Sequence, residues 1–159
     1  MTFWRGTVST RCALALAVLL SPLGVADSAR PAALEVKATA AVRHGQELVP
    51  ADRVIPGDEV FYTLEIRNTG ARALPSPTVD FAIPEHMRYV ADSAVGAGAE
   101  VSYSVDGGRT FDRPDALTVG AGGNRHAATE AEYTHIRWHF KHALKSKAMA
   151  LARFRAIVK

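Results

Sequence analysis

The dominant pattern in this chain is strict alternation of apolar and polar positions. It is clearest at positions 60–67, where Val60, Tyr62, Leu64 and Ile66 alternate with Phe61, Thr63, Glu65 and Arg67. A repeat of two residues is typical of a strand with one buried face. Breaker residues flank the segment at 56–58 (Pro-Gly-Asp) and 68–70 (Asn-Thr-Gly). The pattern therefore predicts a strand between two turns.

The same alternation predicts strands at 34–43, 100–105 and 133–140, the last with Ile136, Trp138 and Phe140 directed inward. Shorter apolar runs predict strands at 78–83 and 149–158, and brief pieces at 87–90 and 117–119. We expect a polar loop at 44–57 and an irregular connection at 68–78. The segment 120–131, rich in glycine and alanine, fits neither repeat.

No segment after the N-terminus has the 3.6-residue repeat of a confident helix. Strands separated by turns every eight to fifteen residues predict an all-β fold, an immunoglobulin-like antiparallel β-sandwich of about seven strands. We assign this domain to residues 34–159, preceded by a short linker at 27–33.

Residues 1–26 have the pattern of an export signal. Arg5 and Arg11 are followed by an uncharged apolar run at 12–20, and small residues precede a cleavage site after Ala26, with Ala29 as the next choice. The run is far shorter than the roughly 20 residues of a membrane-spanning helix. We therefore expect an exported protein, periplasmic or extracellular at the cell surface, with no stable membrane insertion once the signal is removed.

Removal of the signal changes the charge and the cysteine content. The whole chain has 19 Lys+Arg and 16 Asp+Glu, and loss of Arg5 and Arg11 leaves 17 against 16, about +1. So small an excess gives no reason to expect nucleic acid as a partner. The single cysteine, Cys12, also leaves with the signal, so we expect no intrachain disulfide.

Several separated motifs resemble one known family. They are 54–64 (Val-Ile-Pro-Gly-Asp-Glu-Val-Phe-Tyr-Thr-Leu), 67–70 (Arg-Asn-Thr-Gly), 79–84, 89–93 (Tyr-Val-Ala-Asp-Ser), 103–111, 133–138 and 154–158. In order and over residues 34–159, they resemble the bacterial envelope repeat known as domain of unknown function eleven. The resemblance implies a single immunoglobulin-like module of an exported or cell-surface protein, and it implies no catalytic residue. The chain departs from the family pattern at 145–148, before the last strand.

The turn at Asp106-Gly107-Gly108 also looks like an Asp-box, the hairpin motif of sialidase-type propellers. In that motif the aspartate caps the turn and an aromatic residue packs beneath it. A propeller needs several copies and a much longer chain. We therefore interpret Asp106 as a turn residue, with 110–111 starting a return strand.

Six histidines raise the possibility of a metal site, above all His135, His139 and His142. On a helix His135 and His139 would share a face, but on a strand they lie about 13 Å apart, too far for one ion. A site shared between neighbouring strands would need His44, His86 or His126 as a further ligand, and no spacing in the sequence pairs them. We interpret these histidines as a solvated polar face.

Three further groups of residues have both a functional and a structural interpretation. Glu130 and Glu132 beside His126 would form an acid/base set only inside an enclosing pocket; the sequence shows no aromatic-lined cleft, so we interpret them as part of a solvated loop. Trp138 is interpreted as a core anchor, with stacking on a sugar as the alternative. The C-terminal region is basic and indicates a solubilising face, or an edge strand whose charges block aggregation or which meets an acidic envelope polymer; its basic residues are Lys141, Lys145, Lys147, Arg153, Arg155 and Lys159.

The function expected from the sequence is a non-enzymatic, exported structural or protein-interaction module of the bacterial cell envelope. Its partner would be an envelope protein or polymer, met through a sheet face, a loop or an open strand edge. A periplasmic accessory protein that binds carbohydrate or a metal ion is the alternative. No residue is assigned a catalytic, cofactor-binding or metal-binding role.

Overall fold

The computed structural model describes residues 33–159, so the predicted signal peptide and nearly all of the predicted linker lie outside the described residues. The strands, in chain order, are β1 (Leu34–His44), β2 (Glu47–Pro50), β3 (Glu59–Asn68), β4 (Thr78–Ala82), β5 (Met87–Tyr89), β6 (Val95–Gly96), β7 (Ala99–Ser104), β8 (Thr118–Val119), β9 (His126–Ala127), β10 (His135–Phe140) and β11 (Met149–Val158). A 3-10 turn at Gly122–Asn124 is the one helical element of the described range. That range holds no helix long and apolar enough to cross a membrane.

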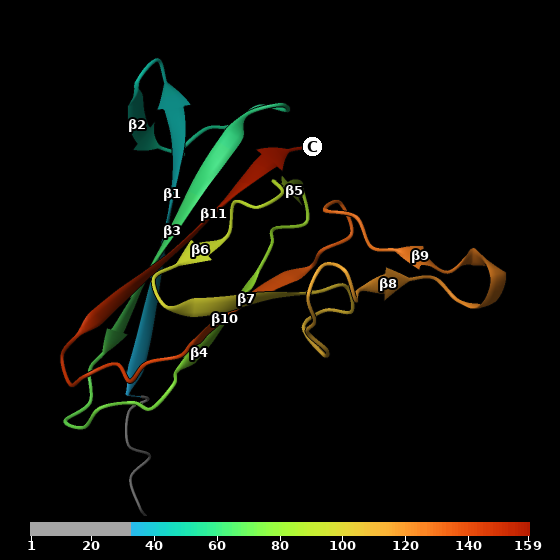
Figure 1. The fold of residues 1–159 in the computed structure, drawn as a ribbon. Helices are drawn as coiled ribbons and strands as arrows, with labels where there is room; N and C mark the ends of the chain where they lie inside the picture. The colour runs from blue at the N-terminus through green and yellow to red at the C-terminus, as the bar shows by residue number, and fades with distance from the viewer. Residues whose placement is uncertain (1–32) are drawn as a thin grey trace, which may run out of the picture. The chain divides into compact units, whose positions relative to one another are not determined.

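Two antiparallel sheets form the body of the molecule (Figure 1). The six-stranded large sheet has the order β2-β1-β3-β11-β5, and β6 also pairs with β11. The three-stranded small sheet has the order β4-β10-β7. A separate ribbon of β8 and β9 projects from the body. The all-β prediction is confirmed.

The core lies between the facing sides of the two sheets. Even positions of β3 point inward, and Leu64 and Ile66 are fully buried. From the small sheet, Trp138 is 0 % exposed and its ring lies 6.2 Å from that of Phe154 in the large sheet. Each such side chain contributes about 1.5–3 kcal/mol by leaving water. The predicted inward face of β10 is confirmed.

Three buried tyrosines close one end of this core. The Tyr89 and Tyr103 hydroxyl oxygens are 2.8 Å apart, and the Tyr103 and Tyr133 rings stack at 4.8 Å. The Ala94 N–H donates to the Tyr89 hydroxyl at 2.9 Å. Burial raises the pKa of Tyr103 far above its ordinary value, so the phenol stays protonated. The Tyr89 and Tyr103 hydroxyls are satisfied within the cluster, and the bond from Ala94 fixes the segment after β5.

Two sequence predictions about loops are wrong. The expected polar loop at 44–57 contains β2, which forms a hairpin with β1 through a turn at Gly45, whose φ is 60°. The expected return strand after Asp106 is reduced to one bridge between Tyr103 and Asp112. Pro114 follows two residues later and has no N–H to continue a ladder.

The apolar face of β1 is buried only at its C-terminal end. Val42 is 6 % exposed, whereas Val36, on the same face, is 43 % exposed. The small sheet has three strands against six, and it does not cover the start of β1. Alternation identified this face correctly but did not show how much of it is covered.

Candidate functional site

A surface depression lies on the outer face of the large sheet, turned away from the small sheet. We call it the outer-face groove. It has a volume of about 370 Å³ and is lined by Leu48, Phe61, Tyr62, Thr63, Ser93, Val95, Arg153, Phe154 and Arg155. The register places Arg155 opposite Phe61 and Arg153 opposite Thr63, so these side chains share one face. The floor is therefore made by neighbouring positions of β3 and β11.

One wall of the groove is the segment between β5 and β6, and Ser93 fastens it to β11. The Arg155 N–H donates to the Ser93 hydroxyl at 3.0 Å, and that hydroxyl donates to the Val90 carbonyl at 2.6 Å. The Val90 N–H in turn donates to the Arg155 carbonyl at 3.0 Å. These bonds fix the wall to the floor, so the groove is formed before any partner arrives.

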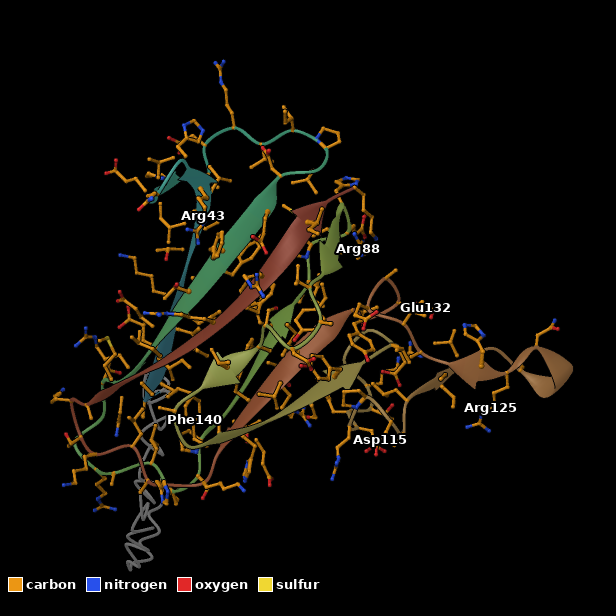
Figure 2. The ribbon with its side chains drawn as sticks, turned by 45° about the horizontal axis from the view of Figure 1, so that its top comes forward. Arg43, Arg88, Asp115, Arg125, Glu132 and Phe140 are labelled. Atoms are coloured by element: carbon orange, nitrogen blue, oxygen red, sulfur yellow. The ribbon has the colours of Figure 1, made fainter. Side chains whose placement is uncertain are left out.

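Arginine side chains dominate the charge of this face. The Arg155 guanidinium donates to Glu59 at 2.7 Å, and the Arg43 guanidinium lies 5.1 Å above the Phe61 ring. Arg153 is exposed and has no ion-pair partner in the described range. Arg43 and Arg88 lie toward one end of the sheet, on β1 and β5 (Figure 2). Of these four arginines, only Arg155 has an ion-pair partner among the described residues.

Exposed apolar side chains surround the arginines. Leu48 is 50 % exposed and Val95 is 54 % exposed, one on each side of the groove. A second depression continues from Val95 and Arg153 to Leu151, which is 37 % exposed. Aromatic residues and arginine between apolar side chains are the composition enriched at protein interfaces. The described lining residues include no carboxylate, histidine or cysteine.

Asp106 lies where the sequence predicted, at the turn after β7. Its carboxylate accepts hydrogen bonds from the N–H groups of Arg109 and Thr110, both at 3.0 Å, and from the Ser104 hydroxyl at 2.7 Å. With the Thr110 hydroxyl, these bonds lower the pKa of Asp106 far below its ordinary value. Gly107 and Gly108 have φ of 78° and 83°. The carboxylate is used by the turn, in agreement with the turn interpretation.

The aromatic residue after this turn packs on an arginine. The Arg137 guanidinium lies 3.7 Å from the centre of the Phe111 ring and forms two 2.7 Å hydrogen bonds to Asp80. Those bonds raise the pKa of Arg137 further. The network ties the segment after the turn to the outer face of the small sheet.

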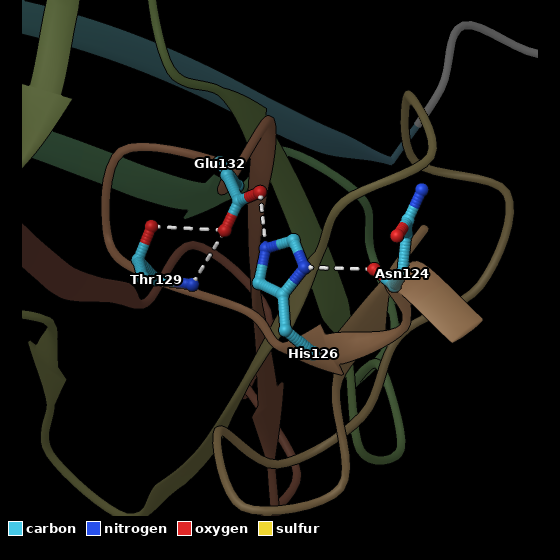
Figure 3. Close-up of polar contacts among 4 residues, drawn as sticks. All are labelled: Asn124, His126, Thr129 and Glu132. Carbon is cyan, nitrogen blue, oxygen red and sulfur yellow. Dashed lines mark hydrogen bonds and ion pairs between the residues drawn. The ribbon is translucent and has the colours of Figure 1, made fainter. Parts of the chain in front are cut away.

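His126 and Glu132 are brought together at the projecting ribbon (Figure 3). The His126 Nε2 lies 3.0 Å from a Glu132 oxygen, and its Nδ1 lies 3.3 Å from the Asn124 carbonyl oxygen. The Asn124 carbonyl and then Glu132 raise the pKa of His126. The N–H and hydroxyl of Thr129, each 2.9 Å from the other oxygen, lower the pKa of Glu132, with His126 contributing. All of these hydrogen bonds lie within positions 124–132, so the pair holds this segment together. We call it the clasp between His126 and Glu132.

The histidines of β10 point to the outer face of the small sheet and bond to neighbouring threonines. The His139 Nδ1 lies 3.0 Å from the Thr78 hydroxyl, and the His135 Nδ1 lies 3.2 Å from the Thr134 hydroxyl. His142 lies against Gly98 instead. Within residues 33–159, no group of three or more His, Cys, Asp or Glu side chains is placed to hold a metal ion.

Two further sequence interpretations have clear outcomes. Trp138 is a core residue at 0 % exposure, so it cannot stack on a sugar. The idea that the basic C-terminal segment is an edge strand is wrong, because β11 lies inside the large sheet, between β3 and the pair β5 and β6. Its alternate residues face the groove rather than an open edge.

The groove was not predicted from the sequence, although a signal was present. Phe61, in the groove, and Leu151, in the depression that continues from it, are apolar residues at positions that alternation assigns to the solvent side of their strands. Such out-of-phase apolar residues mark an exposed patch when they lie on adjacent strands. The pairing of β3 with β11, which brings them together, was not known from the sequence.

Comparison of the chain with models of known families, with curated proteins and with solved structures finds no match.

Proposed function

We propose that this chain is a non-enzymatic, exported structural or protein-interaction module of the bacterial cell envelope, and that it binds its partner through the outer-face groove. The observation that carries the proposal is the preformed floor of Phe61 beside Arg153 and Arg155, between the exposed side chains of Leu48 and Val95. Apolar rims around arginine and an aromatic ring provide both area and directional bonds.

The charge of the groove indicates the chemistry of the partner. Arg153 is unpaired in the described range, while Arg155 is neutralised by Glu59. A carboxylate of the partner segment would pair with Arg153. An apolar side chain beside that carboxylate would at the same time cover Val95 or Leu48. We therefore propose an acidic, partly apolar protein segment as the ligand. Groups already ordered in the groove lower the entropy cost of binding.

We also propose that the two sheets form an immunoglobulin-like sandwich. Support comes from the buried Trp138 on the central strand of the small sheet, which packs toward Phe154 of the opposite sheet. The resemblance to domain of unknown function eleven supports the same fold and an envelope location. Export rests on residues 1–26, which carry the signal pattern in the sequence. Within residues 33–159, no specific contact favours the carbohydrate or metal alternative.

Site-specific photo-cross-linking in intact cells tests the function. A photoreactive residue at Val95, in the groove, should give a discrete adduct with an envelope protein, and one at Arg109, at a turn of the small sheet, should not. The captured protein, once purified, should bind the chain with an affinity that falls as salt increases.

The charge of the groove provides the decisive variant. Arg153→Glu should weaken binding of that protein about tenfold or more, because it places like charges together at an interface. Arg109→Glu makes the same charge change outside the groove and should leave binding unchanged. Equal adducts at both positions, or equal affinities of both variants, would contradict the proposed groove.

A further inference from the structure

The edge of the large sheet along the first half of β1 is open. β1 pairs with β3 over positions 34–42, but β2 covers its other side only from Ala41 onward. The nearest further bond on that side is from the Ala51 N–H to the Ala40 carbonyl, at 3.1 Å. Among the described residues, no strand pairs with positions 34–39 on that side. An open edge offers its N–H and C=O groups to another strand.

The hydrogen bonds at the two ends of β1 show which groups face this edge. The Ala33 carbonyl accepts from the Thr69 N–H at 2.7 Å, so odd positions bond toward β3. The Ala40 carbonyl accepts on the opposite side, so even positions bond away from β3. Leu34, Val36 and Ala38 therefore direct both backbone groups to the open edge.

The side chains of this segment carry a self-complementary charge pattern. Glu35 and Lys37 are both exposed and share the outer face of the sheet. In β3, Arg67 lies opposite Glu35 and Glu65 lies opposite Lys37. Charge therefore alternates both along β1 and across to β3. A strand that runs antiparallel past this edge would meet the same pattern in reverse.

We propose that two copies of the chain pair through this edge, antiparallel, with Val36 opposite Val36 of the second copy. Leu34 of each copy then lies opposite Ala38 of the other. Together with the central Val36 pair, this gives three residue pairs, each of which exchanges two backbone hydrogen bonds. Val36, 43 % exposed in one copy, is covered by its equivalent. Glu35 lies opposite Lys37 of the second copy, twice by symmetry. This association goes beyond the proposed function, since it uses another surface and an identical partner.

The charges select this register among its neighbours. A shift of two residues in one direction places Glu35 opposite Glu35, and the same shift in the other direction places Lys37 opposite Lys37. Like charges directly opposite one another destabilise an antiparallel pair. After a shift of one residue, the free N–H and C=O groups of one copy no longer face those of the other. The apolar face of one strand would then also lie on the solvent side of its partner. The register centred on Val36 pairs opposite charges at both positions.

Sedimentation of the full-length chain, expressed with its own N-terminus, measures the self-association. Over about 1 µM to 1 mM, the range of weak interfaces, we expect a reversible dimer. Glu35→Lys alone and Lys37→Glu alone should each weaken dimerisation about tenfold or more, because each creates two like-charge pairs. Glu47→Lys, an equal charge change on β2, should leave it unchanged.

Mixing the two single variants is the decisive step. In a mixed pair, two lysines on one strand lie opposite two glutamates on the other, so a heterodimer should form as tightly as the original dimer. An edge whose charges merely block aggregation would show no such rescue. A monomer over the whole concentration range, or a dimer that neither single variant weakens, would overturn the proposal.

Discussion

The side-chain nitrogen of Asn68 donates a hydrogen bond to the carbonyl oxygen of Leu144 at 2.9 Å, although the two residues are 76 positions apart. The same Nδ2 lies 2.8 Å from the Arg72 carbonyl oxygen and 3.1 Å from that of Lys145, and the side-chain oxygen accepts from the Gly70 N–H. Asn68 is 0 % exposed. One buried amide thus holds together the connection after β3 and the connection before β11.

Asn68→Ala should lower the free energy of unfolding by about 2–4 kcal/mol, because it removes one amide and leaves partly buried carbonyl groups without a donor. Asn68→Asp should be at least as harmful, since an acceptor would face carbonyl oxygens. Urea unfolding followed by circular dichroism measures both. Asn124→Ala, on the projecting ribbon, is the matched control and should change stability by less than about 0.5 kcal/mol.

Trp138 combines complete burial with an indole N–H that has no hydrogen-bond partner among the described residues. Trp138→Ala should cost about 3–5 kcal/mol through lost burial and the cavity that remains. Trp138→Phe should cost less than half as much, because it keeps a ring and removes an unpaired donor. Denaturant midpoints compare the two variants, and equal losses would show that the indole N–H is satisfied in solution.

Two Arg–Asp pairs of this chain allow a direct comparison of geometry. Arg137 meets Asp80 with two bonds at 2.7 Å, whereas Arg113 and Asp115 are 3.5 Å apart with side chains 80 % and 74 % exposed. A double-mutant cycle should give about 0.5–1 kcal/mol of coupling for the first pair, which is itself partly exposed. The second pair should give a value near zero. Equal coupling would contradict the role assigned to the two-bond geometry and the Phe111 ring.

The clasp between His126 and Glu132 should depend on pH. The pKa of His126 is raised, so its contribution is complete below the ordinary histidine value of about 6.5 and is lost as pH rises through the raised pKa. The pKa of Glu132 is lowered, so its contribution is complete above about 4.3 and is lost as pH falls through the lowered pKa. The clasp is therefore strongest between these values.

Titration of His126 by NMR measures this effect. Glu132→Gln should lower the pKa of His126, and the Asn124 carbonyl should retain part of the shift. Glu130→Gln removes the same charge two positions away and should leave the His126 titration nearly unchanged. If both variants lower the pKa equally, general charge rather than the 3.0 Å contact is the cause.

The local sequence was sufficient for the long strands and for one turn. In β3 and β10 every second residue is apolar, and a side chain on a strand can point only to one face or the other. The turn at Asp106 was equally predictable, because an aspartate and two glycines supply the caps and positive φ angles within five residues. These features depend on contacts between near neighbours.

The tertiary structure decided which of those faces are covered and what meets on them. Val36 and Val42 occupy equivalent positions of one strand, yet only Val42 is buried, since burial depends on the extent of the opposite sheet. Phe61 meets Arg155, and Asn68 reaches Leu144, only because β3 pairs with β11 at one register. Alternation fixes the side to which a residue points, whereas the partners of that side come from distant parts of the chain, and no local pattern encodes them.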